Sequence, residues 1–399
     1  MTAQIDETPT MIHSGRLPRP PRVTRIQVFH LAPNFPGKPM PRAHRGCRRA
    51  ILWGIGLFVL IQVAMNLAIR NDLVPVRDPV WFEKLALLQA YGGFLPDSAD
   101  NGTSPQPRLL ALGSSRTQLA FDACRLEQTV SEATGQPIRA FNFGCPAAGA
   151  MTCSLYFQRL LAEKLSTDYL LLEIHPGFVA EHEPPFESRW LHPYRLSESE
   201  VQHLRSLGWA IEDPPQHGWL GWLTAVRSYR MSLLNRYAPV LLPCPFGLTL
   251  GSKSNPDGFV RGQEMPRDRY PKALARTRQE YAPVLADYRV GGPGPAAIRA
   301  ILASCRARGI TAAVILMPES SEHREWYGAE GHRSLALFTA SLNDEFQVPM
   351  IDARDWVPDT GFADGHHLTA SGAAIFTDRL AKDFILGWLA KSPDARATE

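Results

Sequence analysis

Two short segments, far apart in the sequence, hold the residue types that acyl transfer through a serine requires. Residues 108–116, RLLALGSSR, are an apolar run that ends in a glycine and two serines. This pattern is typical of a buried parallel strand that leads through a turn into a helix, and it places Ser115 on the turn. Residues 362–372, FADGHHLTASG, place Asp364 and His367 three positions apart before a helical pattern. Together the segments offer a nucleophile, a general base and a carboxylate that orients the base.

The order and spacing of these residues resemble the SGNH (GDSL-like) hydrolase superfamily. That family carries its serine in a Gly-Asp-Ser block after the first strand, and it carries an Asp-x-x-His near the end of the domain. By position, the resemblance implies that Ser115 is the nucleophile, His367 the base and Asp364 its partner. His366 is the weaker candidate for the base because it follows the aspartate by only two residues. We treat Arg116 and His366, which adjoin the serine and the base, as candidates for substrate binding.

A tetrahedral intermediate also needs donors for its oxyanion, and two places in the sequence offer backbone N–H groups. A helix is predicted over residues 117–126, so the helix N-terminus and its positive dipole end would lie beside Ser115. In SGNH enzymes, a glycine after the second strand supplies a further N–H group. Here the loop GCPAAG follows that strand, so Gly144, Ala147 and Gly149 all remain open for this role, with Gly144 favoured.

The sequence departs from the family after the third predicted strand. The family has a Gly-x-Asn-Asp block there, whose asparagine side chain donates to the oxyanion, whereas this chain has HPGF at residues 175–178. Either another donor substitutes for the asparagine or the site is tuned differently. Glu173 and His175 stand near the carboxyl end of the strand, where open α/β sheets bind their ligands. We therefore add His175 to the candidates for substrate binding.

A parallel α/β sheet has to bring the two chemical segments together. Apolar strands are predicted over residues 109–112, 137–143, 168–174, 311–317 and 349–352. Helical patterns between them include residues 148–164, 296–308 and 334–346. Right-handed crossovers place the carboxyl ends of all the strands on one side of the sheet. The sequence thus predicts a three-layer, flavodoxin-like sandwich in two parts, residues 108–180 and 295–390, with Ser115 and His367 at one edge.

Residues 181–294 interrupt this alternation and are predicted to form a helical, aromatic-rich insertion. Residues 197–200 make a capping box, and residues 219–237 have apolar residues at near-helical spacing. The aromatic residues of the insertion include Trp209, Trp219, Trp222 and Tyr229. Such residues are typical of a packed core or of a lid, and an insertion of this length in a compact fold commonly covers the site.

An apolar segment near the N-terminus predicts a membrane helix. Residues 50–69 contain no charge, and about twenty helical residues span ~30 Å, the thickness of a bilayer core. Residues 1–49 are basic and rich in proline, which is typical of a disordered cytoplasmic tail. Because the basic side stays in the cytoplasm, the main domain is predicted to be periplasmic. Residues 70–107 would connect the anchor to it, and residues 391–399 would be a C-terminal tail.

Composition gives little support to several other classes of protein. The formal net charge is +3 for 399 residues, so the chain has no basic excess that would favour a nucleic-acid partner. None of the six cysteines forms a C-x-x-C motif, and the sequence suggests neither a metal site nor a cofactor. Cys47 would be cytoplasmic. The other five would lie in an oxidising space, where an odd number leaves at least one outside an internal disulfide.

The GSS block and the membrane helix are similar to those of membrane-anchored SGNH-like proteins of alginate O-acetylation and teichoic acid D-alanylation. The resemblance implies a transferase or esterase that acts on O-acyl groups of an envelope polysaccharide or glycan, and O-acetyl groups are the ones expected. It also implies a multispanning membrane O-acyltransferase as partner. Two alternatives stay open: an inactive protein of this fold that binds polysaccharide or assists the acyltransferase, and a soluble hydrolase whose apolar segment does not span a membrane.

Overall fold

The computed structural model describes residues 43–96, 106–182, 186–211, 219–242 and 254–391. Its contacts divide the chain into two units, residues 1–55 and 56–399, and the boundary falls within the helix α1 (Ala43–Arg70). Most of the predicted tail over residues 1–49, and much of the predicted C-terminal tail, lie outside the described residues.

Helix α1 contains the predicted membrane segment. Its stretch Cys47–Arg70 has a mean hydropathy of 2.0 and is long enough to cross a bilayer. Large apolar side chains on this helix are exposed, among them Trp53, Phe58 and Leu60. By length and composition, α1 fits either a membrane anchor or a signal sequence.

The second unit is built on a five-stranded sheet in which every neighbouring pair of strands is parallel. The strands are β1 (Arg108–Gly113), β2 (Arg139–Gly144), β3 (Tyr169–Glu173), β4 (Thr311–Leu316) and β5 (Met350–Asp352). Their order is β2-β1-β3-β4-β5, which is that of flavodoxin-like folds. The predicted fold class is confirmed, and each strand lies within two residues of its predicted bounds. The order reverses between β1 and β3, and their carboxyl ends carry Ser115 and His175.

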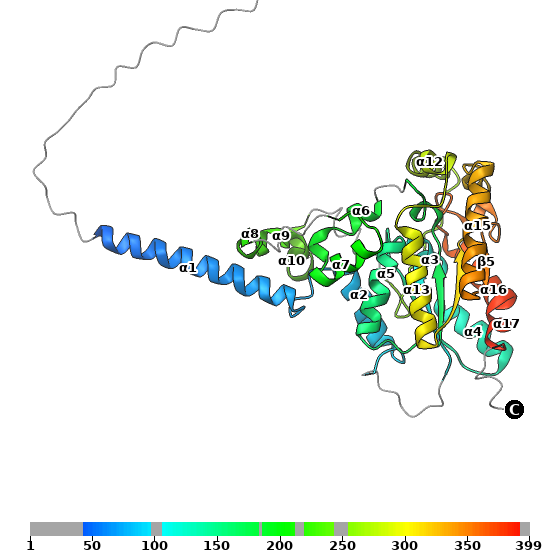
Figure 1. Cartoon of the computed structure of the whole chain (residues 1–399), viewed down its shortest axis with the longest axis horizontal. Helices are drawn as coiled ribbons and strands as arrows, with labels where there is room; N and C mark the ends of the chain where they lie inside the picture. Colours follow the sequence, from blue (N-terminus) through cyan, green and yellow to red (C-terminus); the bar gives the residue numbers. More distant parts are fainter. Residues whose placement is uncertain (1–42, 97–105, 183–185, 212–218, 243–253, 392–399) are drawn as a thin grey trace, which may run out of the picture. The chain divides into compact units, whose positions relative to one another are not determined.

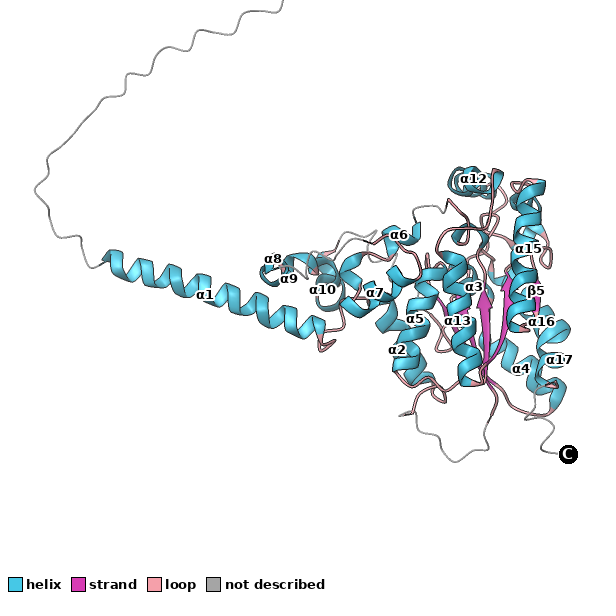
Figure 2. Cartoon of the chain, in the orientation of Figure 1, coloured by secondary structure: helices cyan, strands magenta, loops and turns pink. Residues whose placement is uncertain are grey.

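Helices cover both faces of the sheet, which gives three layers (Figure 1, Figure 2). One apolar cluster packs α2 (Pro79–Tyr91), α5 (Ala150–Ala162), α13 (Gly294–Arg308) and α15 (Ala329–Phe346) against the first face. A second cluster packs α4 (Ala123–Thr134), α16 (Ala370–Leu380), the π-helical turn η6 (Ala381–Ile385) and α17 (Leu386–Leu389) against the other. Helix α2 lies in the predicted connector over residues 70–107, and its residues Trp81 and Leu88 belong to the first cluster.

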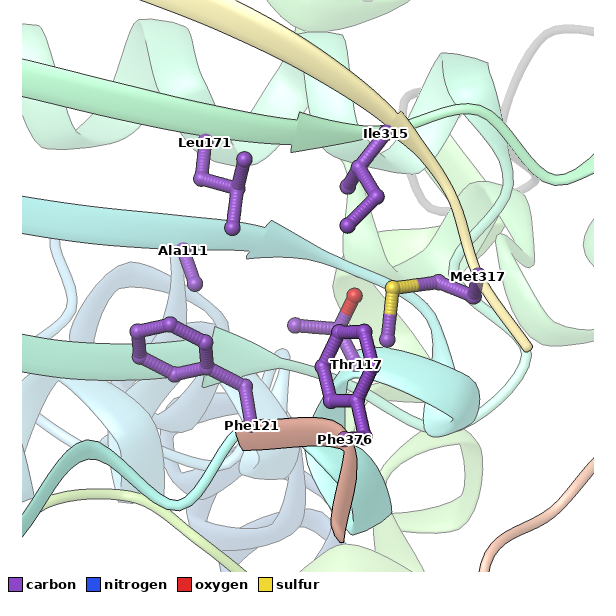
Figure 3. Close-up of a pocket in the computed structure, with 7 residues that line it drawn as sticks. All are labelled: Ala111, Thr117, Phe121, Leu171, Ile315, Met317 and Phe376. Carbon is purple, nitrogen blue, oxygen red and sulfur yellow. The ribbon is translucent and has the colours of Figure 1, made fainter. Parts of the chain in front are cut away.

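The second face is packed without room for a water molecule near the middle of the sheet. Figure 3 shows apolar side chains from β1, β3 and β4 meeting the ring of Phe376 from α16 and the ring of Phe121 from a turn. The residues that meet there are Ala111, Thr117, Phe121, Leu171, Ile315, Met317 and Phe376. This packing leaves no cavity at that place on the second face of the sheet.

The helix predicted over residues 117–126 is in fact two helices, α3 (Ser115–Ala120) and α4 (Ala123–Thr134). Asp122 caps α4 by accepting a hydrogen bond from the N–H of Arg125. The buried side chain of Asn142 donates to the carbonyls of Thr117 and Phe121 at 2.9 and 2.7 Å. The carbonyl of Thr117 also accepts the N–H of Phe121 at 3.0 Å, so Asn142 ties the end of α3 to the turn that leads into α4.

The insertion also differs from its prediction. Residues 219–237 form three short helices, α8 (Trp219–Leu223), α9 (Ala225–Ser228) and α10 (Arg230–Tyr237), in place of one. The predicted capping box is present at the start of α7 (Glu198–Ser206). A longer helix, α12 (Tyr270–Ala286), lies in the insertion that was predicted to be helical, but no separate helix was predicted there. The ends of the insertion meet at an isolated antiparallel bridge between Ala180 and Val290.

Two polar residues of the apolar segment bind this insertion. The side chain of Asn66 donates to the carbonyl of Gly221 at 3.1 Å, and Gln62 Oε1 accepts from the N–H of Val226 at 3.0 Å. Both side chains are buried. Arg70 lies 4.7 Å from the ring of Trp222. The C-terminal turns of α1 are thus held against α8 and α9 by polar contacts.

No disulfide forms among the described residues, where Cys47, Cys124, Cys145, Cys153 and Cys305 are free. Cys244 lies outside the described residues.

Candidate active site

The structure brings Ser115, His367 and Asp364 into one hydrogen-bonded chain. Ser115 Oγ lies 2.8 Å from His367 Nε2, although the two residues are 252 positions apart. On the other side of the ring, His367 Nδ1 lies 2.8 Å from Asp364 Oδ2. With the proton on Nδ1, the imidazole donates to the carboxylate and its Nε2 accepts from the serine hydroxyl. This is the tautomer that a general base for serine needs.

The carboxylate of Asp364 is fixed by backbone as well as by the ring. Its Oδ1 accepts from the N–H groups of His367 and His366 at 2.9 and 3.3 Å. Gly365 has φ of 99°, and its carbonyl accepts from the N–H of Ser320 at 2.8 Å, which closes the loop tightly. Burial alone would raise the pKa of Asp364. The adjacent imidazoles and hydrogen bonds outweigh burial and hold that pKa well below its usual range, so the carboxylate stays ionised.

Glu173 holds the turn that carries Ser115, a role that was not predicted from the sequence. Its carboxylate accepts from the N–H and the hydroxyl of Ser114 at 2.7 and 2.8 Å, and from the hydroxyl of Thr117 at 2.6 Å. A Cβ atom at Gly113 would lie only 2.3 Å from Glu173 Oε2, so the turn needs glycine for this approach. The available signal was a single acidic residue at the end of an otherwise apolar strand. Glu173 therefore positions Ser115 through its neighbours.

The oxyanion donors differ from the favoured prediction. The N–H of Gly144 donates to the buried Asn142 Oδ1 at 2.8 Å and is therefore not available to a ligand. The N–H of Gly149 faces the buried carboxylate of Glu187 at the start of α5. Neither glycine lines the cavity that contains Ser115. The structure thus corrects the prediction for both residues.

Ala147, the third open candidate, lines that cavity and has φ of 52°. This left-handed conformation is uncommon outside glycine. Ser115 is the first residue of α3, so its N–H has no acceptor within the helix. The described residues show no hydrogen bond from either N–H group. The geometry therefore favours the N–H groups of Ser115 and Ala147 as the oxyanion donors.

The cavity beside Ser115 has a volume of about 680 Å³. Its inner wall includes Ala147, His175 and His366, and its outer wall is helix α12 of the insertion. Of the aromatic residues singled out in the insertion, Trp209 and Tyr229 are buried elsewhere, and neither these two nor Trp222 lines the cavity. The side chain of Trp219 lies outside the described part of the chain. The insertion does reach the site, but through a helix that the sequence analysis did not predict.

Arg116 does not reach the cavity. Its guanidinium is 1% exposed, and Nη2 donates to the carbonyls of Met317 and Pro318 at 2.7 and 3.0 Å. The same nitrogen lies 3.2 Å from Glu319 Oε1, which is fully buried. This burial contradicts the prediction that Arg116 binds substrate. Arg116 is instead a cation beneath the site, paired with Glu319.

His366 and His175 both line the cavity, as a substrate-binding role would require. The ring of His366 lies 4.0 Å from that of His367 and 5.0 Å from that of Tyr281, measured between centroids. Its Nδ1 is 3.9 Å from Asp364 Oδ1, too far for a hydrogen bond. Burial lowers the pKa of His366 well below its usual range. His366 is therefore a neutral side chain that does not touch Ser115 within the described contacts.

Asp364, His366 and His367 are also close enough to hold a metal ion, since one ligand atom from each lies within 4.8 Å of the others. However, His367 already uses both ring nitrogens for Ser115 and Asp364. A metal ion would have to displace one of these hydrogen bonds. The observed arrangement fits proton transfer better than metal binding.

The sequence matches no protein-family model and no curated protein. Among solved structures, the chain is similar to a carbohydrate acetylesterase family member from Sinorhizobium meliloti, with 12% identity and a TM-score of 0.31. That match covers 71% of this chain and 100% of the other. A lipase/acylhydrolase from Enterococcus faecalis matches with 11% identity and a TM-score of 0.28, over 70% of this chain and 97% of the other. We base the fold class on the strand order of this chain.

Proposed function

We propose that this protein is a serine acyltransferase or esterase that acts on O-acetyl groups of an envelope polysaccharide or glycan. One observation carries the proposal: Ser115 Oγ, His367 and Asp364 form a continuous chain of 2.8 Å contacts at the wall of an open cavity. Serine is a weak nucleophile near neutral pH, and a base at this distance with an ionised partner is what activates it.

The reaction would run in two halves. His367 Nε2 takes the hydroxyl proton of Ser115 while Oγ bonds to the carbonyl carbon of the acyl donor. The tetrahedral intermediate collapses when the bond to the leaving oxygen breaks, and His367 returns the proton to that oxygen. The acyl-serine is then attacked by water or by a glycan hydroxyl, whose proton passes to His367. The final collapse returns this proton to Ser115. Water as acceptor makes an esterase, and a sugar hydroxyl makes a transferase.

The membrane topology is part of the proposal. Helix α1 would anchor the chain, because its segment Cys47–Arg70 is apolar and long enough to span a bilayer. Arg48 and Arg49 stand at the N-terminal side of the apolar run, so this side would remain in the cytoplasm and the α/β unit would be periplasmic. There a multispanning membrane O-acyltransferase could deliver the acyl group.

The test uses the full chain in detergent micelles or nanodiscs. The purified protein is incubated with p-nitrophenyl acetate, with and without an oligosaccharide acceptor, and release of nitrophenol and acetylation of the acceptor are both measured. The Ser115→Ala variant should lose both activities by about 10³-fold or more. Ser371→Ala is the matched control, since Ser371 is an exposed serine whose hydroxyl bonds to Glu264.

An acetylated acceptor that depends on Ser115 would establish a transferase, and hydrolysis alone an esterase. Equal turnover by wild type and Ser115→Ala would contradict the proposal. A wild-type protein that binds glycan but turns over no ester would favour the alternative of an inactive binding protein.

A further inference from the structure

His175 follows β3 at the edge where the strand order reverses, and it lines the same cavity as Ser115 and Ala147. Its ring is held in a narrow set of orientations. It stacks on Tyr281 with 5.6 Å between centroids and 28° between planes, and it packs against Phe178 at 4.6 Å. The side chain is 7% exposed. Such a ring presents one edge to the cavity and has little freedom to turn away.

The hydrogen bonding of the ring decides which nitrogen carries the proton. His175 Nδ1 accepts from the backbone N–H of Gly177 at 3.2 Å, so this nitrogen carries no proton. In a neutral imidazole the proton is then on Nε2. No described residue forms a hydrogen bond with Nε2. The fully buried polar atoms that lack a partner do not include Nε2, so this atom is accessible from the cavity. Nε2–H is therefore an open donor at the cavity wall.

The surroundings of the ring keep it neutral. Burial lowers the pKa of His175 well below its usual range, and the Arg116 guanidinium and the nearby imidazoles of His366 and His323 lower it further. This gives the buried Arg116 a role in the site that does not require contact with substrate. A neutral imidazole keeps one donor and one acceptor nitrogen, whereas an imidazolium would lose its bond to the N–H of Gly177.

We propose that His175 donates its Nε2–H to the oxyanion that forms when Ser115 attacks the acyl donor. This inference rests on the proposed function and adds a third donor to the N–H groups of Ser115 and Ala147. A donor in a fixed position, shielded from bulk water, stabilises developing negative charge without reorganisation. In this chain a neutral histidine thus does what an asparagine side chain does where the Gly-x-Asn-Asp block is present.

The test compares His175→Phe, which keeps an aromatic ring against Tyr281 but has no donor, with His175→Gln, which keeps a donor on a flexible chain. We expect His175→Phe to lower kcat for p-nitrophenyl acetate by about 10²-fold to 10³-fold, with KM changed by less than about threefold. His175→Gln should recover part of this loss. His332→Phe, at an exposed position on α15, is the matched control and should behave as wild type.

The shape of the pH profile separates the donor role from an acid or base role. Because His175 is neutral throughout the working range, His175→Phe should lower kcat equally from pH 5.5 to 8.5. Thermal unfolding of each variant shows whether it is folded. If His175→Phe is not folded, the decision rests on His175→Gln, for which a loss in kcat of about tenfold or more is expected.

Unchanged kcat in a folded His175 variant would overturn the inference, and so would a loss confined to KM or a shift of the pH profile. In each of these cases Ser115-dependent turnover by the wild type would leave the proposed function standing. If wild type and Ser115→Ala turn over ester equally, the proposed function fails and this inference fails with it.

Discussion

Two of the histidines that line the cavity beside Ser115, His367 and His175, differ in the hydrogen bonds that their ring nitrogens form with the protein. His367 contacts Asp364 through Nδ1 and Ser115 through Nε2. His175 accepts a backbone N–H at Nδ1 and leaves Nε2 open. An Nδ1 that donates to a carboxylate makes Nε2 an acceptor, and an Nδ1 that accepts from an amide makes Nε2 a donor. The same side chain is thus suited to proton abstraction in one place and to anion stabilisation in the other.

The difference arises from the local chain. His367 follows an aspartate by three residues in a loop tightened at Gly365, so the carboxylate reaches both its ring and its backbone. His175 precedes a proline and a glycine, and the short turn Pro176–Phe178 brings the N–H of Gly177 back to its ring. Either arrangement can be tested by changing one residue.

The largest expected effect separates the two adjacent histidines, His366 and His367. His367→Gln should lower kcat by about 10⁴-fold to 10⁶-fold, because the serine loses its base. His366→Gln should lower kcat by less than about tenfold. The ring of His366 contacts neither Ser115 nor Asp364 Oδ2, the oxygen that is hydrogen-bonded to the ring of His367. Steady-state hydrolysis of p-nitrophenyl acetate measures kcat for both variants. A larger loss in His366→Gln than in His367→Gln would reverse the assignment of the base.

A smaller effect is expected at Glu173, which positions the nucleophile without touching substrate. Glu173→Gln replaces one carboxylate oxygen by an NH₂ group, which cannot accept the hydrogen bonds that this oxygen accepts from Ser114 or Thr117. Ser115 should shift, and a misplacement of about 1 Å costs up to about 10²-fold, so we expect kcat to fall by about 10-fold to 10²-fold. The rate of reaction with a fluorophosphonate should fall in parallel.

Glu127→Gln is the control for Glu173→Gln. Glu127 also accepts from a backbone N–H, that of Ala140, and from the hydroxyl of Tyr91, each at 2.7 Å. It does not line the cavity. This variant should lose stability but keep kcat. An equal fall of kcat in both variants would mean that general loosening of the fold, and not the nucleophile turn, explains the effect.

The last prediction concerns stability and not turnover, at Glu187, whose carboxylate accepts from the N–H of Thr152 at 2.6 Å. Burial raises its pKa from 4.5 to about 7. Between pH 4.5 and about 7, the Glu187 carboxyl is protonated in the folded state and ionised in the unfolded state. The contribution of this protonation to stability is therefore complete below pH 4.5 and is lost as pH rises to about 7. This loss amounts to about 3 kcal/mol.

Thermal unfolding between pH 4.5 and 8 tests this claim. Relative to Glu187→Gln, the wild type should become less stable as pH rises, and the difference should level off above about pH 8. A constant difference across this range would show that Glu187 is ionised throughout.

The fold could be predicted from the sequence because the strands of a parallel sheet are buried on both faces. These strands are continuous apolar runs, such as DYLLLEI, which are easy to recognise. The pairing of Ser115 with His367 was predictable from parallel topology, which places their segments at one edge. Helix α12 was missed because its sequence contains Pro271 and Pro283 and many charges, so its apolar face is weak. The role of Gly144 was misassigned because a sequence does not show that Asn142 would take its N–H.

The most direct test of the account is covalent labelling of the full-length wild type with a fluorophosphonate probe, followed by mass spectrometry of its peptides. We expect one modified residue, Ser115, with labelling abolished in Ser115→Ala and slowed by at least about 10²-fold in His367→Gln. Labelling of a different serine, or labelling of Ser115 at the same rate without His367, would contradict the claim that these residues form a nucleophile and its base.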